Sequence, residues 1–176
     1  MFKTKVLKSR DLKSMVFEYI TYRIYQFYQQ NHMKNDLGFS KLMKLLYFIS
    51  GVDKDNHLFD IFRFQTWQYG HMEPDLYDIF SKNKGKFNHF VVDRFSFEWT
   101  SLDNDIPTIE DPDIKKRVDI CVDIMITEHP NTITAGFWNL LFILQNLISY
   151  KHMVKYNICY EDMDKNLMIY EPKVYL

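Results

Sequence analysis

The stretch KLMKLLYFISGVDKDNHLFDIFRFQTWQYGHMEPDLY, residues 41–77, decides the fold predicted for this chain. Its first ten residues are apolar around most of a helix, and only Lys41 and Lys44 form a polar stripe. A helix of this kind is expected to be packed by neighbours on several flanks. The stretch therefore predicts a central helix over residues 41–50, ended by Gly51.

A polar loop over residues 53–57 and a turn ending at Gly70 follow this helix. Glycine is free to adopt backbone conformations that other residues avoid, which suits a tight turn. The tripeptide Glu73-Pro74-Asp75 comes next. It predicts a helix start, because proline is tolerated in a first turn and carboxylates favour the positive end of the helix dipole.

Apolar residues at steps of three and four predict three more helices. They run over residues 12–30, from Asp111-Pro112 to Pro130, and from Thr132 or Thr134 to about Tyr150. β-forming residues predict two minor hairpins, at about 90–99 and 156–170. The fold class expected is mainly α: one compact domain over residues 1–176, built as a helical bundle around the 41–50 helix.

The composition favours a well-packed core. The chain is 47% hydrophobic and 17% aromatic, but no apolar run approaches the ~20 residues of a membrane span. The N-terminal residues lack the apolar region of a signal peptide, so a cytoplasmic location is expected. Cys121 and Cys159 stand far apart in apolar surroundings, which favours free thiols in the interior.

Charge is distributed unevenly along the chain. Residues 1–50 carry nine Lys and Arg against three Asp and Glu, whereas residues 51–112 carry six against twelve. The formal net charge is only -1. This layout suits protein partners, since a nucleic-acid-binding domain is usually net basic.

Two groups of acidic residues resemble metal sites. A calcium loop beginning at Asp53 would need glycine at its sixth position and glutamate at its twelfth, where Leu58 and Phe64 stand. His71, with Glu73 and the aspartates after it, lacks the paired His or Cys ligands of a zinc site. A solvated turn and a helix start explain these groups, so no metal is predicted.

Sequence motifs for catalysis are also missing. The chain has five glycines, no Gly-x-Ser-x-Gly turn and no glycine-rich phosphate loop. No enzymatic activity and no cofactor are predicted.

Several elements of residues 41–77 occur together in the order of a known family. They are the lysine- and leucine-rich motif of residues 41–48, then Gly51, then Leu58-Phe59-Asp60, then Trp67-x-Tyr69-Gly70, then Pro74-x-Leu76-Tyr77. The chain resembles the Panacea family, also called SocA-like antitoxin domains. The match covers about residues 12–80, and the part from about residue 100 diverges.

Some positions depart from the family pattern. Thr66 replaces the usual alanine before the tryptophan, and His71 replaces the usual proline after the glycine. The downstream His-Trp pair of the family is missing.

The resemblance implies the antitoxin of a type II toxin–antitoxin system, which neutralises a cognate toxin by direct protein–protein binding. Two alternatives remain open. A phage or mobile element could use the domain as an interaction or inhibitor protein. A nucleic-acid-binding regulator could instead use the basic N-terminal arm, which contains Lys3, Lys5, Lys8, Arg10 and Lys13.

The family-motif residues are expected to form scaffold: Lys41, Leu42, Lys44, Leu45, Leu46, Tyr47, Gly51, Trp67, Tyr69, Gly70, Pro74 and Tyr77. The partner surface is expected on the acidic segment 53–60 and the aromatic segment 87–99. Its candidate residues are Asp53, Asp55, Asp60, Phe95, Phe97 and Trp99. Such a surface would favour a basic partner.

Overall fold

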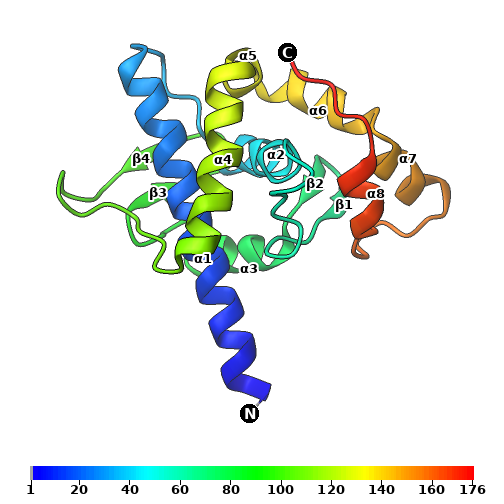
Figure 1. Cartoon of the computed structure of the whole chain (residues 1–176), viewed down its shortest axis with the longest axis horizontal. Helices are drawn as coiled ribbons and strands as arrows, with labels where there is room; N and C mark the ends of the chain where they lie inside the picture. Colours follow the sequence, from blue (N-terminus) through cyan, green and yellow to red (C-terminus); the bar gives the residue numbers. More distant parts are fainter. Residues whose placement is uncertain (1) are drawn as a thin grey trace.

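The computed structural model describes residues 2–176, with side chains described from Arg10 onward. The described residues form eight helices and two antiparallel two-stranded hairpins, so the fold is mainly α (Figure 1). The elements are α1 (Phe2–Gln30), α2 (Phe39–Ser50), β1 (Gln65–Trp67), β2 (Gly70–Met72), α3 (Pro74–Lys82), β3 (Phe90–Val92), β4 (Phe97–Trp99), α4 (Pro112–Glu128), α5 (Pro130–Thr134), α6 (Phe137–Gln145), α7 (Ile148–Lys155) and α8 (Lys165–Tyr170).

Every residue of α2 is buried. Helices α1, α4 and α6 and strand β2 all pack against it, and Figure 1 shows it almost end-on near the middle of the molecule. The sequence predicted the helix from residue 41. It begins instead at Phe39, because backbone carbonyls of the β3–β4 turn accept its first N–H groups: Phe39 N lies 2.9 Å from Asp93 O, and Ser40 N lies 3.2 Å from Arg94 O.

The two lysines of α2 are buried as well, although they form the polar stripe of its sequence. The Lys41 ammonium donates hydrogen bonds to the Asp36 carboxylate at 2.8 Å and to the Tyr28 hydroxyl at 2.6 Å. Lys44 is fully buried, and its ammonium donates to the backbone oxygen of His71 at 3.1 Å. Burial lowers the pKa of Lys44 to about 7, and the positive charge of Arg94 acts in the same direction.

Two predicted helix starts are confirmed. Glu73 caps α3 by accepting a hydrogen bond from Leu76 N at 2.8 Å, and Pro74 is the first helical residue. Asp111 caps α4 in the same way, followed by Pro112. Helix α1, in contrast, continues through Asp11 to Phe2 rather than beginning at Leu12.

The predicted long helix through residue 150 is wrong. The chain forms α5, α6 and α7 there, separated by residues in extended conformation: Ala135 and Gly136 in the first break, and Leu147 in the second. A continuous helix would keep one face toward the core. The breaks let each short helix turn a different face inward, Leu140 and Leu144 from α6 and Met153 from α7.

One predicted hairpin is confirmed and the other is wrong. Strands β3 and β4 pair with Phe90 opposite Trp99, within the predicted range of residues 90–99. The β-prone residues at 167–170 instead form most of helix α8. Asp164 caps that helix by accepting a hydrogen bond from Leu167 N at 2.8 Å, and this local bond favours the helix over a strand.

We predict that Gly38→Ala destabilises the fold by about 1–3 kcal/mol, the usual range for overpacking. A Cβ at Gly38 would lie 2.3 Å from the Cα of Phe95 and 2.4 Å from Arg94 O, so backbone atoms of the β3–β4 turn must move. Urea denaturation followed by circular dichroism measures the change.

Gly136→Ala is the matched control, because a Cβ there meets no atom within 4 Å. We expect it to cost less than about 1 kcal/mol, the preference for glycine over alanine at the N-cap of α6. Equal losses in the two variants would contradict the steric role of Gly38.

We predict that Lys44→Met removes a pH dependence of stability. Because the folded pKa of Lys44, about 7, lies below the ordinary lysine value, the unfolded chain binds more protons between these two values, and stability rises with pH there. From pH 7 to pH 9 the free energy of unfolding of the wild type should gain about 1 kcal/mol per pH unit relative to the variant. Urea denaturation at each pH tests this, and a constant difference between the two proteins would contradict it.

Candidate functional site

The β1–β2 turn and the β3–β4 turn place two side chains face to face. Gly70, at a φ of +87°, allows the tight reversal that follows Tyr69. The guanidinium carbon of Arg94 lies 4.2 Å from the centre of the Tyr69 ring. Next to Arg94, the side chain of Phe95 is 60% exposed and its ring lies 5.8 Å from that of Phe137 in α6.

Helix α6 contains no charged residue and is apolar on both its buried and its exposed side. Leu140, Leu141 and Leu144 face the core. Trp138 and Phe142 are 67% and 69% exposed, and their spacing of four residues puts them on one side of the helix. Two large rings therefore stand mostly in solvent.

Three hollows form a row along these residues. A cleft of about 470 Å³ lies beside Tyr69 and Arg94, and a hollow of about 400 Å³ lies between Tyr69, Trp138 and Phe142. A third of about 370 Å³ lies between Phe142 and Ile148. Because neighbouring hollows share lining residues, the surface is continuous. We call the surface formed by Tyr69, Arg94, Phe95, Trp138, Phe142 and Ile148 the aromatic strip.

The family-motif residues divide between core and surface. Those of α2, together with Gly51, are buried. Trp67, Tyr69 and Tyr77 instead line the 470 Å³ cleft, where the Trp67 ring packs edge-on against Tyr77 at 4.7 Å and lies 5.5 Å from Tyr160. Part of the motif thus borders the aromatic strip rather than the core.

The acidic part of the predicted partner surface lies against α4. The Asp60 carboxylate binds the Arg117 guanidinium through two hydrogen bonds of 2.8 and 2.9 Å. The Asp53 carboxylate accepts N–H groups of its own loop, including that of Asp55 at 3.0 Å. Asp53 and Asp60 are therefore engaged within the chain, and Asp55 remains exposed.

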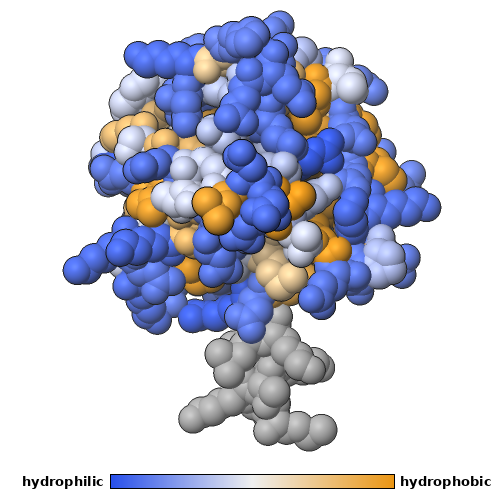
Figure 2. All heavy atoms as spheres, turned by 90° about the vertical axis from the view of Figure 1, so that its left-hand side faces the viewer, coloured by the Kyte–Doolittle hydropathy of each residue, from blue (hydrophilic) through white to orange (hydrophobic). Residues whose placement is uncertain are grey.

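The aromatic residues of the predicted partner surface lie in two places: Phe97 and Trp99 pack against α1, and Phe95 lies on the aromatic strip. Trp99 stacks on Tyr25 of α1 at 5.6 Å, and Phe97 lies 5.3 Å from the same ring. Figure 2 views the molecule from the side of the β3–β4 hairpin, where hydrophilic spheres separate the hydrophobic ones. Of the six candidate residues, Phe95 is the one that lies on the aromatic strip.

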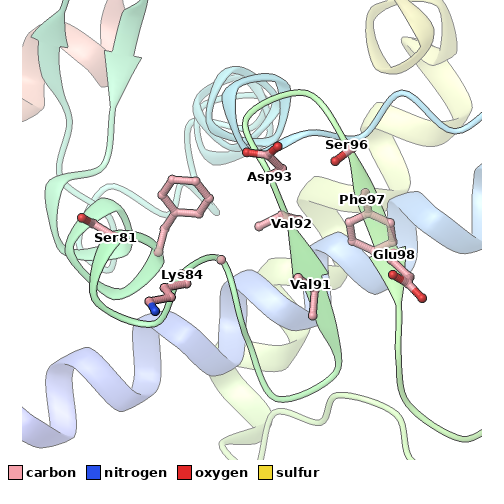
Figure 3. A pocket seen from close by; sticks show the side chains of 10 residues that line it. Ser81, Lys84, Val91, Val92, Asp93, Ser96, Phe97 and Glu98 are labelled. Carbon is pink, nitrogen blue, oxygen red and sulfur yellow. The ribbon is translucent and has the colours of Figure 1, made fainter.

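A further hollow, of about 650 Å³, lies between the end of α3 and the β3–β4 hairpin. Figure 3 shows Lys84 and Glu98 on opposite sides of it, with Val91 and Val92 between them. Its charged groups do not converge on one point, so it offers no evident place for a reacting or coordinated group.

The buried polar groups in the core serve the fold. Glu171, in the segment after α8, accepts hydrogen bonds from the Tyr47 hydroxyl and from the Ser149 N–H at 2.7 Å and hydroxyl at 2.7 Å. The His71 Nε2 lies 3.2 Å from the Ser149 hydroxyl. Burial holds the pKa of His71 well below its ordinary value. Since His71, Ser149 and Tyr47 are fully buried, no substrate reaches this network.

The acidic residues after His71, which resemble a metal site in the sequence, bind basic side chains of the chain instead. The buried Glu73 carboxylate and Asp75 both bind the Lys13 ammonium, the former at 2.7 Å, and Arg63 binds Asp75 at 3.0 Å. These partners help to lower the pKa of Asp75 to about 2, although burial opposes them. Within residues 2–176 no three His, Cys, Asp or Glu side chains are placed to hold a metal ion.

The basic residues proposed for nucleic-acid binding are partly engaged. Lys3, Lys5 and Lys8 lie outside the residues whose side chains are described, and Arg10 pairs with Asp78 at 3.0 Å. In the basic run Lys115-Lys116-Arg117, Lys115 pairs with Asp119 at 2.6 Å. No helix in the described part of the chain is both long and apolar enough to cross a bilayer.

The sequence interpretation missed Trp138 and Phe142. A signal was present: α6 is apolar at Leu140, Leu141 and Leu144, which already supply one buried face, so two further rings spaced by four residues require a second apolar face. Such a helix is either enclosed on all sides or left with an exposed apolar surface.

No family model matches the sequence, and neither a curated protein nor a solved structure matches it.

Proposed function

We propose that this protein acts by binding another protein, as the antitoxin of a type II toxin–antitoxin pair. It would neutralise the toxin by covering it in a stoichiometric complex. The antitoxin role is supported by the resemblance of residues 41–77 to Panacea, or SocA-like, domains. The binding mode is supported by the aromatic strip.

One observation carries the proposal of protein binding: Trp138 and Phe142 are mostly exposed on a helix without a single charge. Exposed apolar patches of this kind are typical of interaction sites. Trp, Tyr and Arg are enriched among the residues that dominate binding energy, and the strip supplies one of each in Trp138, Tyr69 and Arg94.

Two alternatives use the same fold differently. An interaction or inhibitor protein of a phage or mobile element would use the same strip against a host protein, so only the identity of the partner separates it from an antitoxin. A nucleic-acid regulator is less favoured, because Arg10, Lys13 and Lys115 already bind carboxylates of the chain.

We predict that this chain protects cells from the product of the adjacent reading frame, and that the double variant Trp138→Ala/Phe142→Ala does not. The reason is that the variant loses both exposed rings while its buried residues are unchanged. Growth is measured with the neighbour expressed alone, with the wild type and with the variant, and co-purification reports complex formation.

Tyr170→Ala is the matched control, since Tyr170 is an equally exposed aromatic side chain on α8 that lines none of the three hollows of the strip. It should protect as the wild type does. A harmless neighbour that does not co-purify argues against the antitoxin role. Protection that survives the loss of both rings argues against the strip as the binding surface.

A further inference from the structure

The segment that carries the helical part of the aromatic strip has positive charges and no carboxylate. Residues 129–160, which include α6 and α7, contain no Asp or Glu, while Lys151 and Lys155 of α7 are exposed. At the other end of the strip stands Arg94. The apolar surface is therefore bordered by cations at both ends.

The two lysines face the same way as the strip. Ile148, Lys151 and Lys155 are spaced by three and four residues, so they lie along one side of α7. Ile148 itself lines the hollow next to Phe142. A segment lying along α6 would meet Trp138 and Phe142 first and this basic side of α7 next.

These cations are not paired within the described residues. Arg94, Lys151 and Lys155 form no ion pair with any carboxylate there; Arg94 and Lys155 instead lie over the rings of Tyr69 and Tyr156. Two carboxylates near in sequence are engaged elsewhere: Asp162 binds Arg63 at 3.0 Å, and Glu171 is buried. Three others are exposed: Glu98, Glu161 and Asp93, whose oxygen accepts the N–H of Arg94 at 2.7 Å.

We propose that the aromatic strip binds an acidic amphipathic helix of the partner protein. Its apolar side would fill the hollows beside Trp138 and Phe142, and its Asp and Glu residues would meet Arg94 at one end and Lys151 and Lys155 at the other. This inference rests on the proposed function, and it names a partner opposite in charge to the basic one expected from the acidic segment 53–60.

Two other occupants fit the surface less well. An anionic membrane is recognised by clusters of about four to eight Lys and Arg, whereas the strip and its border together offer two lysines and one arginine. A second copy of the chain would bring a surface bordered by the same cations and would supply no carboxylate from residues 129–160.

Two labelled peptides test the proposal. Both are designed helices of about five turns with the same leucine side, one carrying glutamates on its polar side and the other lysines. Fluorescence anisotropy measures their binding to the full-length protein. We expect the glutamate peptide to bind at least about tenfold more tightly, and Trp138→Ala to weaken it by about tenfold. The double variant Lys151→Glu/Lys155→Glu should reverse the preference, and Tyr170→Ala should change nothing.

Several results would overturn the proposal. The proposal is wrong if both peptides bind equally, if neither binds, or if Trp138→Ala leaves binding of the glutamate peptide unchanged. A dimer that depends on Trp138 in sedimentation, without peptide binding, would identify a second copy as the occupant. Binding to phosphatidylserine vesicles, again without peptide binding, would identify a membrane.

The outcomes separate this inference from the proposed function. If the glutamate peptide binds through Trp138 but the chain gives no protection in the growth assay, the result supports the acidic helix site and contradicts the antitoxin role. If the chain protects cells but the lysine peptide binds more tightly, the result supports the antitoxin role and contradicts an acidic partner.

Discussion

The structure depends on how the first amides of α2 are satisfied. A helix whose whole surface is buried has no water at its ends, so its N–H groups need partners from the chain. Asp93 and Arg94 supply those partners through their backbone carbonyls, and Gly38 lets the two segments approach closely enough. One contact thus completes the core helix and also fixes the turn that carries Arg94 and Phe95.

A second set of buried polar contacts holds the other end of the aromatic strip. Glu171 joins Tyr47 of α2 to Ser149 of α7, which places α7 beside α6 although the chain breaks between them. Four of the side chains of the strip, Phe95, Trp138, Phe142 and Ile148, are more than half exposed. The strip consists of side chains left outside because the elements beneath them are already packed, and this is the property expected of a surface reserved for a partner.

Elements whose signals are local could be predicted from the sequence, and those that depend on distant contacts could not. The caps Glu73 and Asp111 act within three residues of the chain, so the starts of α3 and α4 were predictable. The breaks between α5, α6 and α7 follow from which core surfaces lie nearby. The tail was predicted as a hairpin from β-prone residues, where the cap at Asp164 and packing of Met168 and Ile169 produce a helix.

The sequence by itself determined the apolar helix of residues 41–50, the helix starts at Pro74 and Pro112, and the turn at Gly70, because each follows from backbone and side-chain preferences within a few residues. Only the tertiary structure decided which aromatic residues are buried. Tyr47 and Trp138 both stand in apolar helices, yet Tyr47 is covered by segments up to 124 residues away and Trp138 is 67% exposed. The physical reason is that burial depends on neighbours brought from distant parts of the chain, and local periodicity does not encode them.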